Sequence, residues 1–393
     1  MKKPFLLTVL AGALILVGCE STDSPKPKPA PGPAVGQPVA PAQPVKPAQP
    51  KKVATDRNKV LNEYKAATIA MRNGNYAEAK VQLDDALLTI NNIFGNNHDA
   101  KRARSYFSEE SKKTFVGEPY ERVMANYYRG ILYWMDGEPD NARACFRNGQ
   151  YEDSDAENKA YSQDYVLLDY LDGLASVKLA GDGSDHLKSA KASAKMAVPP
   201  DPVKANNVLF FVEMGQGPVK YADGKYQEFL RFRPGSSAAS KALIKIATAT
   251  LMAPAYDDLS FQATTRGGRL MDHILGNKAV FKSTTDTVGN AALVSGAALG
   301  AAGGNNEAAL GVAAAGLVFK LLSAASTPKA DIRCWDNLPN YLSFSSARLA
   351  PGDYSATVEF LNGGGAVVGV PRTVNFKVTG TDRDTVVFVS DRN

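Results

Sequence analysis

The spacing of apolar residues changes once along the chain, close to residue 200. Between 56 and 200, apolar residues recur at helical spacing, prolines are few and alanines are many, which predicts amphipathic helices. After residue 200, short runs rich in Val, Phe, Tyr and Thr are separated by glycine-rich turns, which predicts β-strands. The pattern therefore predicts an α+β protein, with a helical domain over 56–200 and a β-rich domain over 201–393.

The strands of the second domain fall into two stretches. The runs lie at 207–214, 227–232 and 242–251, and then at 342–348, 354–361, 367–370, 373–378 and 385–389. Because isolated strands would leave unpaired edges, we expect both stretches to form a single sheet or sandwich. Residues 264–327 are then a helical insertion. Its Gly- and Ala-rich part, 288–325, indicates a helical hairpin packed on the body, with membrane insertion or self-association through its glycines as the alternative.

Two stretches of the helical domain resemble tetratricopeptide repeats. Small residues fall where that repeat brings paired helices close, and large residues fall where it fills the gap between pairs. The matching residues are Ala67, Gly74, Tyr76, Ala79, Leu83 and Ala86 in the first unit, and Gly130, Tyr133, Gly137, Ala142 and Phe146 in the second. A third helical pair is expected at 157–180 and 184–196. The resemblance implies a tetratricopeptide-like α-solenoid.

A solenoid of this kind presents a concave groove, and the resemblance assigns eight side chains to it. They are Leu61, Tyr64 and Met71 in the first unit, and Met124, Tyr127, Ile131, Trp134 and Met135 in the second. The second set is unusually apolar for a surface. It is either a binding site for an apolar helix or peptide, or a face buried beneath the neighbouring helix or the next domain.

The first residues are typical of a secretory signal peptide over 1–18. Two lysines precede an apolar run over 5–17 that is too short to span a bilayer, and small residues follow it. The segment 16–19 (Leu-Val-Gly-Cys) resembles the lipobox of bacterial lipoproteins, which implies cleavage after residue 18 and acylation of Cys19. Glu20 in place of aspartate implies the outer membrane of a Gram-negative bacterium, with the protein facing the periplasm and held in the bilayer by its lipid.

Residues 19–55 are predicted to be a tether. Ten prolines lie between 25 and 50, and such a segment favours extended polyproline II, which rises ~3.1 Å per residue. Residues 1–52 also hold seven lysines and two acids, which accounts for the whole net charge of +5. Because the remaining body is close to neutral, the charge balance argues against a nucleic-acid partner.

The sequence offers no catalytic, cofactor or metal site. The three histidines, His98, His186 and His273, lie in separate segments without metal-ligand spacing. There is no nucleophile elbow, phosphate-binding loop or dinucleotide fingerprint. The sequence leaves open whether Cys145 and Cys334 form a disulfide. We therefore expect a protein that is not an enzyme and carries no cofactor.

Three segments, 115–122, 262–269 and 329–339, resemble a poorly characterised family of bacterial repeat-containing lipoproteins. The resemblance implies work in the cell envelope. With the tether and the repeat-like units, it leads us to expect an adaptor or scaffold that binds unidentified envelope proteins. The alternative is a membrane-active or homo-oligomeric envelope assembly formed through 288–325.

Overall fold

The computed structural model describes residues 56–95, 113–154, 161–247, 249–265, 329–380 and 382–392. Residues 54–393 cluster into one compact unit. The expected signal peptide and the whole tether, including Cys19, lie outside the described residues, as does the Gly- and Ala-rich segment 288–325.

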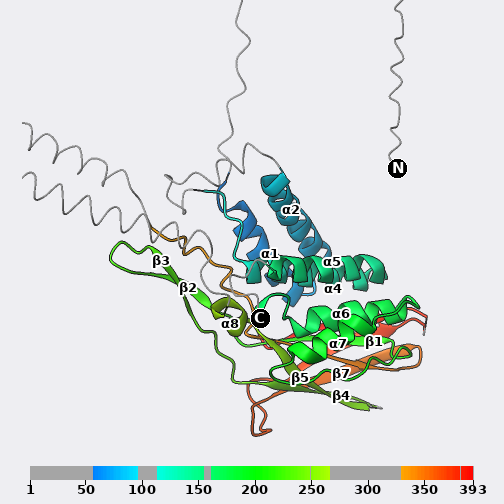
Figure 1. Cartoon of the computed structure of the whole chain (residues 1–393). Helices are drawn as coiled ribbons and strands as arrows, with labels where there is room; N and C mark the ends of the chain where they lie inside the picture. The colour runs from blue at the N-terminus through cyan, green and yellow to red at the C-terminus, as the bar shows by residue number, and fades with distance from the viewer. Residues whose placement is uncertain are drawn as a thin grey trace, which may run out of the picture. The chain divides into compact units, whose positions relative to one another are not determined.

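Helices occupy the first part of the unit, as the apolar spacing predicts (Figure 1). They are α1 (Lys59–Arg72), α2 (Tyr76–Gly95), α4 (Pro119–Met135), α5 (Pro139–Asp153), α6 (Val166–Lys178) and α7 (Ser184–Ser193). The first two pairs turn at Gly74 and Gly137, whose positive φ angles of 74° and 82° suit glycine. These pairs fall where the repeat-like units are expected. The helices lie against a β-sheet, however, and the structure does not show a tetratricopeptide solenoid.

The second part contains one seven-stranded sheet in the order β8-β7-β4-β5-β6-β1-β9. Its strands are β1 (Val208–Met214), β4 (Lys241–Ile246), β5 (Ala249–Asp258), β6 (Tyr341–Ala347), β7 (Gly352–Leu361), β8 (Arg372–Val378) and β9 (Thr385–Ser390). Strand β1 pairs with β6 antiparallel and with β9 parallel, and β4 pairs with β7. Strands from both strand-rich stretches therefore join one sheet, as expected, although the run at 227–232 does not belong to it, and the fold is α+β.

Three strand predictions need correction. The run at 242–251 is two antiparallel strands, β4 and β5, because its apolar residues continue on both sides of a tight turn. The run at 367–370 contributes only an isolated bridge between Leu361 and Val367. A separate hairpin, β2 (Val219–Asp223) and β3 (Phe229–Arg233), includes a strand that the sequence analysis missed. A short helix, α8 (Leu259–Thr264), follows β5.

The sheet curls until it is nearly closed, and it carries a hydrophobic core on each face. Phe210 and Val212 of β1 point into the curl, where Phe210 meets Phe376 of the edge strand β8 at 5.7 Å between ring centroids. Leu209 and Phe211, the alternate residues of β1, pack against the helices. Strand β1 is therefore buried on both faces, and the helical and β parts share one core.

Polar contacts also fasten the helices to the sheet. Arg72, at the end of α1, forms an ion pair with Glu213 of β1 at 2.6 Å between Nε and Oε1. The hydroxyl of Tyr128 on α4 donates to the other oxygen of Glu213 at 2.6 Å. Both charged side chains are almost fully buried, so α1 and α4 are tied to the same position of β1. Among the described residues, no helix combines the length and apolar character required to cross a membrane.

Gly130 should be intolerant of larger residues, because α4 and α5 approach each other there. A Cβ at Gly130 would lie 2.5 Å from Cε1 of Phe146. We expect Gly130→Val to lower the free energy of unfolding by about 1–3 kcal/mol through overpacking. Urea denaturation of the full chain measures the change. Gly363→Val is the matched control, because a Cβ at Gly363 meets nothing within 4 Å. Equal stability of the two variants would contradict the close approach.

Candidate functional site

The side chains predicted to line a groove are mostly buried. Leu61, Tyr64, Met71, Met124, Tyr127, Ile131 and Trp134 lie in the core, and Met135 is partly buried. Tyr64 stacks on Trp335 with 4.2 Å between ring centroids, and the indole N–H of Trp134 donates to Asp384 at 2.9 Å. They do not line an open groove, because the sheet and the chain before β6 cover them. These side chains are buried beneath neighbouring elements, which is the second of the two alternatives that the sequence left open.

The segments 115–122, 262–269 and 329–339 are called the family-like segments below. A buried charge cluster brings the first and the third of them together. The first, 115–122, forms the start of α4. Gly117 has a φ of +80°, and Pro119 is the first helical residue. The backbone N–H of Glu118 donates to Oε2 of Glu121 at 2.7 Å, and Arg122 donates to the carbonyl of Gly117 at 2.9 Å. The order Gly-Glu-Pro-Tyr-Glu-Arg is therefore that of a capped helix start.

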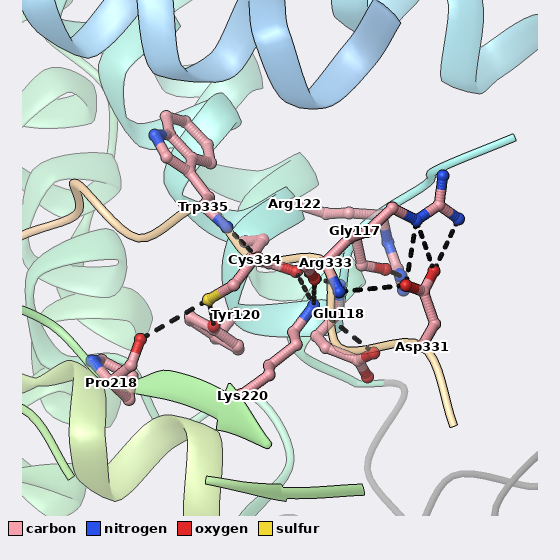
Figure 2. Close-up of polar contacts among 11 residues, drawn as sticks. Gly117, Glu118, Tyr120, Arg122, Pro218, Lys220, Asp331, Arg333, Cys334 and Trp335 are labelled. Atoms are coloured by element: carbon pink, nitrogen blue, oxygen red, sulfur yellow. Dashed lines mark hydrogen bonds and ion pairs between the residues drawn. The ribbon is translucent and has the colours of Figure 1, made fainter. Parts of the chain in front are cut away.

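Lys220 of β2 enters this helix start from the hairpin. Its ammonium lies 2.5 Å from Oε2 of Glu121 and 3.7 Å from Glu118, and it donates to the carbonyl of Arg333 at 3.0 Å (Figure 2). The side chain of Lys220 is 2 % exposed and that of Glu121 is 0 % exposed. A buried ion pair is tolerated when its remaining donors and acceptors are satisfied. The second oxygen of Glu121 meets that condition by accepting the backbone N–H of Trp335 at 2.7 Å.

The third family-like segment, 329–339, closes the cluster from the other side. Arg333 pairs with Asp331 at 2.6 Å between Nη2 and Oδ2. Its guanidinium also donates to the carbonyl oxygens of Arg57 and Lys113, at 3.1 Å and 2.9 Å, and to the side chain of Asn58 at 3.0 Å. Arg333 therefore joins the first described residues of the folded unit to the cluster.

Trp335 links the same segment to the helices. Besides stacking on Tyr64, its indole N–H donates to the hydroxyl of Thr68 on α1 at 2.9 Å. Neighbouring Cys334 places its sulfur 3.6 Å from the hydroxyl of Tyr120. Segments that lie more than two hundred residues apart in the sequence thus share one network.

The pKa shifts in this cluster are those of buried groups that stabilise the fold. Burial alone lowers the pKa of Lys220, but Glu121 and Glu118 outweigh it, and the pKa lies above its ordinary value. Burial raises the pKa of Cys334 to about 11, so its sulfur is a neutral thiol near pH 7 and a poor nucleophile. Cys334 and Cys145 are both free cysteines and are not joined by a disulfide. Within the described ranges, no group of three or more His, Cys, Asp or Glu side chains could hold a metal ion.

A half-open pocket of about 400 Å³, part of which is open to solvent, lies beside α6 and α8. The carboxylate of Asp257 accepts the backbone N–H groups of Val166 and Leu167, at 2.8 Å and 2.9 Å, where α6 begins. Burial raises the pKa of Asp257 to about 7, although these two hydrogen bonds oppose the shift.

The other polar groups of the pocket also bond to one another. Asp164 pairs with Lys195 at 2.7 Å and accepts from the amide of Gln262 at 2.9 Å. Gln262 is the first residue of the second family-like segment, whose residues from 266 onward lie outside the described ones. The polar contacts that line the pocket therefore hold α6 and α8 against β5.

One face of the β2–β3 hairpin differs, because it presents its polar and aromatic groups to solvent. Tyr221 pairs across the strands with Arg231, and Asp223 pairs with Phe229. Arg233 lies two residues beyond Arg231 on the same side, and all five residues are exposed. The guanidinium groups of Arg231 and Arg233 lie over the rings of Phe229 and Tyr221, each 5.7 Å from the ring centroid. We call these five residues the hairpin face.

The opposite side of the hairpin is fixed to the body. Lys220 enters the buried cluster, and Phe232 meets Tyr120 edge-on at 5.8 Å between ring centroids. Leu230 packs on Ala330. The alternation of buried and exposed residues therefore gives this short hairpin one anchored side and one displayed side.

The sequence contains a local signal for this hairpin. Asp223-Gly224 lies between alternating residues and is a pair typical of hairpin turns, and Gly224, which has a φ of +92°, opens the connection 224–228 between the strands. Nothing comparable marks the burial of Lys220 or Asp257, because their partners come from distant segments.

No protein-family model matches the chain, and comparisons with curated proteins and with solved structures find no match. Functional inference therefore rests on the sequence and the geometry.

Removing Lys220 should destabilise the fold far more than removing an exposed lysine. Lys220→Met leaves the Glu121 carboxylate buried without its charge partner, and we expect a loss of about 3–5 kcal/mol in the free energy of unfolding. Lys245→Met is the control, because Lys245 is 48 % exposed and pairs with Glu359 at 2.6 Å at the surface of the sheet. That variant should lose at most about 1 kcal/mol in urea denaturation. Similar losses would show that the buried pair is not a principal joint.

Asp257 should make the protein less stable as the pH rises from about 4 to 7. Its folded pKa, about 7, lies above the ordinary value of 3.8, so the folded state keeps a proton that the unfolded state has released. The contribution of Asp257 to the free energy of unfolding is therefore fully present below about pH 4. It is lost as the pH rises to about 7. We expect Asp257→Asn to flatten the pH dependence of the unfolding free energy. The exposed Asp353→Asn is the control, and an unchanged slope in Asp257→Asn would contradict the assignment.

Proposed function

We propose that the chain is a lipid-anchored adaptor of the cell envelope that binds another protein through the hairpin face. The proposal combines acylation at Cys19, the tether over 19–55 and the folded unit that begins at residue 56. Under this proposal the protein belongs to the outer membrane, faces the periplasm and performs no catalysis itself.

The observation that carries the proposal is the composition of the hairpin face. Tyr221 and Phe229 are each 39 % exposed, and two arginines lie beside them. Aromatic residues and arginine are enriched at protein interfaces and supply much of the binding energy there. Exposed aliphatic side chains elsewhere, such as Val370 and Met252, offer no ring over which a guanidinium can lie.

The attachment of the hairpin supports the same function. Its inner side is held by the ion pair of Lys220 with Glu121 and by the contact of Phe232 with Tyr120. A face that is ordered before binding loses less conformational entropy when a partner docks, which favours affinity. The buried cluster therefore serves the proposed interface by holding the hairpin in place.

The tether gives the adaptor its working range. If residues 19–55 are extended, they reach on the order of 100 Å, at ~3.1 Å per residue. Several acyl chains on Cys19 provide firm membrane attachment, which one chain alone does not. The lipid thus sets the location of the protein, and the hairpin face selects its partner.

The second function considered from the sequence, an assembly formed through 288–325, rests on residues outside the described ranges. No observation on the described residues favours it over the adaptor.

Site-specific crosslinking in intact cells tests the adaptor. A photoreactive phenylalanine analogue replaces Tyr221 in one strain and Asn375, an exposed residue of β8, in the control strain. We expect a discrete protein adduct from position 221 and none from position 375, measured by immunoblotting and mass spectrometry. The full chain should fractionate with membranes, and Cys19→Ser should release it.

Two results would contradict the proposal. Absence of any protein adduct at position 221, or the same adducts at 221 and 375, would remove the hairpin face as a binding surface. Membrane association that persists in Cys19→Ser would remove the proposed anchor.

A further inference from the structure

We propose that the hairpin face binds an extended acidic segment of its partner, with carboxylates at alternate positions. This inference rests on the proposed adaptor function and adds the chemical class of the partner.

The charge of the face is complementary to an acidic ligand. Arg231 and Arg233 outnumber Asp223, and the exposed Lys225 adds a third cation at the turn. Among the described residues, the guanidinium of Arg233 has no ion-pair partner. Arg231 lies 3.7 Å from Asp223, but both side chains are more than half exposed, so that pair contributes little and exchanges readily.

The spacing of the arginines matches an extended peptide. Arg231 and Arg233 are two residues apart on one strand, which separates their Cα atoms by about 7 Å. Alternate residues of an extended ligand have the same period. Each guanidinium lies 5.7 Å from the centroid of an aromatic ring, and its N–H groups, which lie in the guanidinium plane, can donate to carboxylate oxygens. A ligand lying along β3 can therefore place one carboxylate at each arginine.

The same features disfavour a membrane surface as the ligand. Segments that bind anionic lipids by charge carry clusters of about 4–8 basic residues, whereas this face with its turn carries three cations and two acids, of which Glu228 is buried. Membrane insertion also requires apolar groups that enter the headgroup region by about 5–10 Å. Tyr221 and Phe229 are each only 39 % exposed, so most of each ring is already packed.

Fluorescence anisotropy with a defined probe tests the acidic class. The probe is a labelled peptide of about twelve alternating glutamate and threonine residues, and the control peptide has glutamine in place of glutamate. The purified full chain is compared with an Arg231→Ser, Arg233→Ser double variant. The matched control is Arg348→Ser, which removes an exposed arginine beyond the end of β6 far from the hairpin.

We expect the glutamate peptide to bind the full chain and the Arg348→Ser variant with the same affinity. The double variant should bind at least about tenfold more weakly, the cost of two charge-assisted contacts. Binding should weaken as salt rises. Equal binding of the glutamine peptide, equal binding by the double variant, or no measurable binding of the glutamate peptide would overturn the inference.

Binding to vesicles that contain phosphatidylglycerol tests whether the hairpin face contacts a membrane and not an acidic peptide. If vesicles bind the full chain but not the double variant, and the peptide does not bind, the face is a membrane contact and the inference is wrong. The crosslinking experiment separates this failure from failure of the adaptor. An adduct at position 221 without glutamate-peptide binding would reject only the acidic class, whereas loss of both would reject the adaptor as well.

Discussion

The ion pair between Lys220 and Glu121 is the contact on which the arrangement of the folded unit depends. It joins the start of α4 to the hairpin, and the carbonyl of Arg333 and the backbone N–H of Trp335 bring the chain before β6 to the same point. Charges in a medium of low polarity require partners at nearly every donor and acceptor. That requirement restricts how these three segments can pack, whereas apolar contacts alone would tolerate several packings.

Full satisfaction of these groups also distinguishes the cluster from a reactive site. A catalytic group needs a lone pair or a proton that is directed at a substrate and not already engaged by other protein groups. It also needs a protonation state suited to its task. Lys220 is fully engaged, the Cys334 thiol is protonated, and Asp257 is occupied by two backbone N–H groups of α6. Lys220, Cys334 and Asp257 therefore hold elements of the fold together, and under the proposed function a partner would contact the hairpin face.

The sequence predicts the elements of this protein better than their arrangement. Helical spacing located the pairs that turn at Gly74 and Gly137, and alternation located most strands, because these patterns are local. It left open whether Tyr127 and Trp134 line a groove or are buried beneath the next element, since an apolar helix face looks the same whether it meets a ligand or a strand. The meeting of segments 115–122 and 329–339 at Lys220 was not predictable, because one lysine in an unpredicted strand connects them.

Arg333 gives the folded unit a short mechanical path. It holds the carbonyl of Arg57 through its guanidinium, and its own carbonyl accepts from Lys220 on the hairpin. Tension between residue 57 and the hairpin has its shortest bonded route across these two side chains, without crossing the seven-stranded sheet. A pull between residue 57 and the hairpin therefore loads the buried cluster directly and bypasses the seven-stranded sheet.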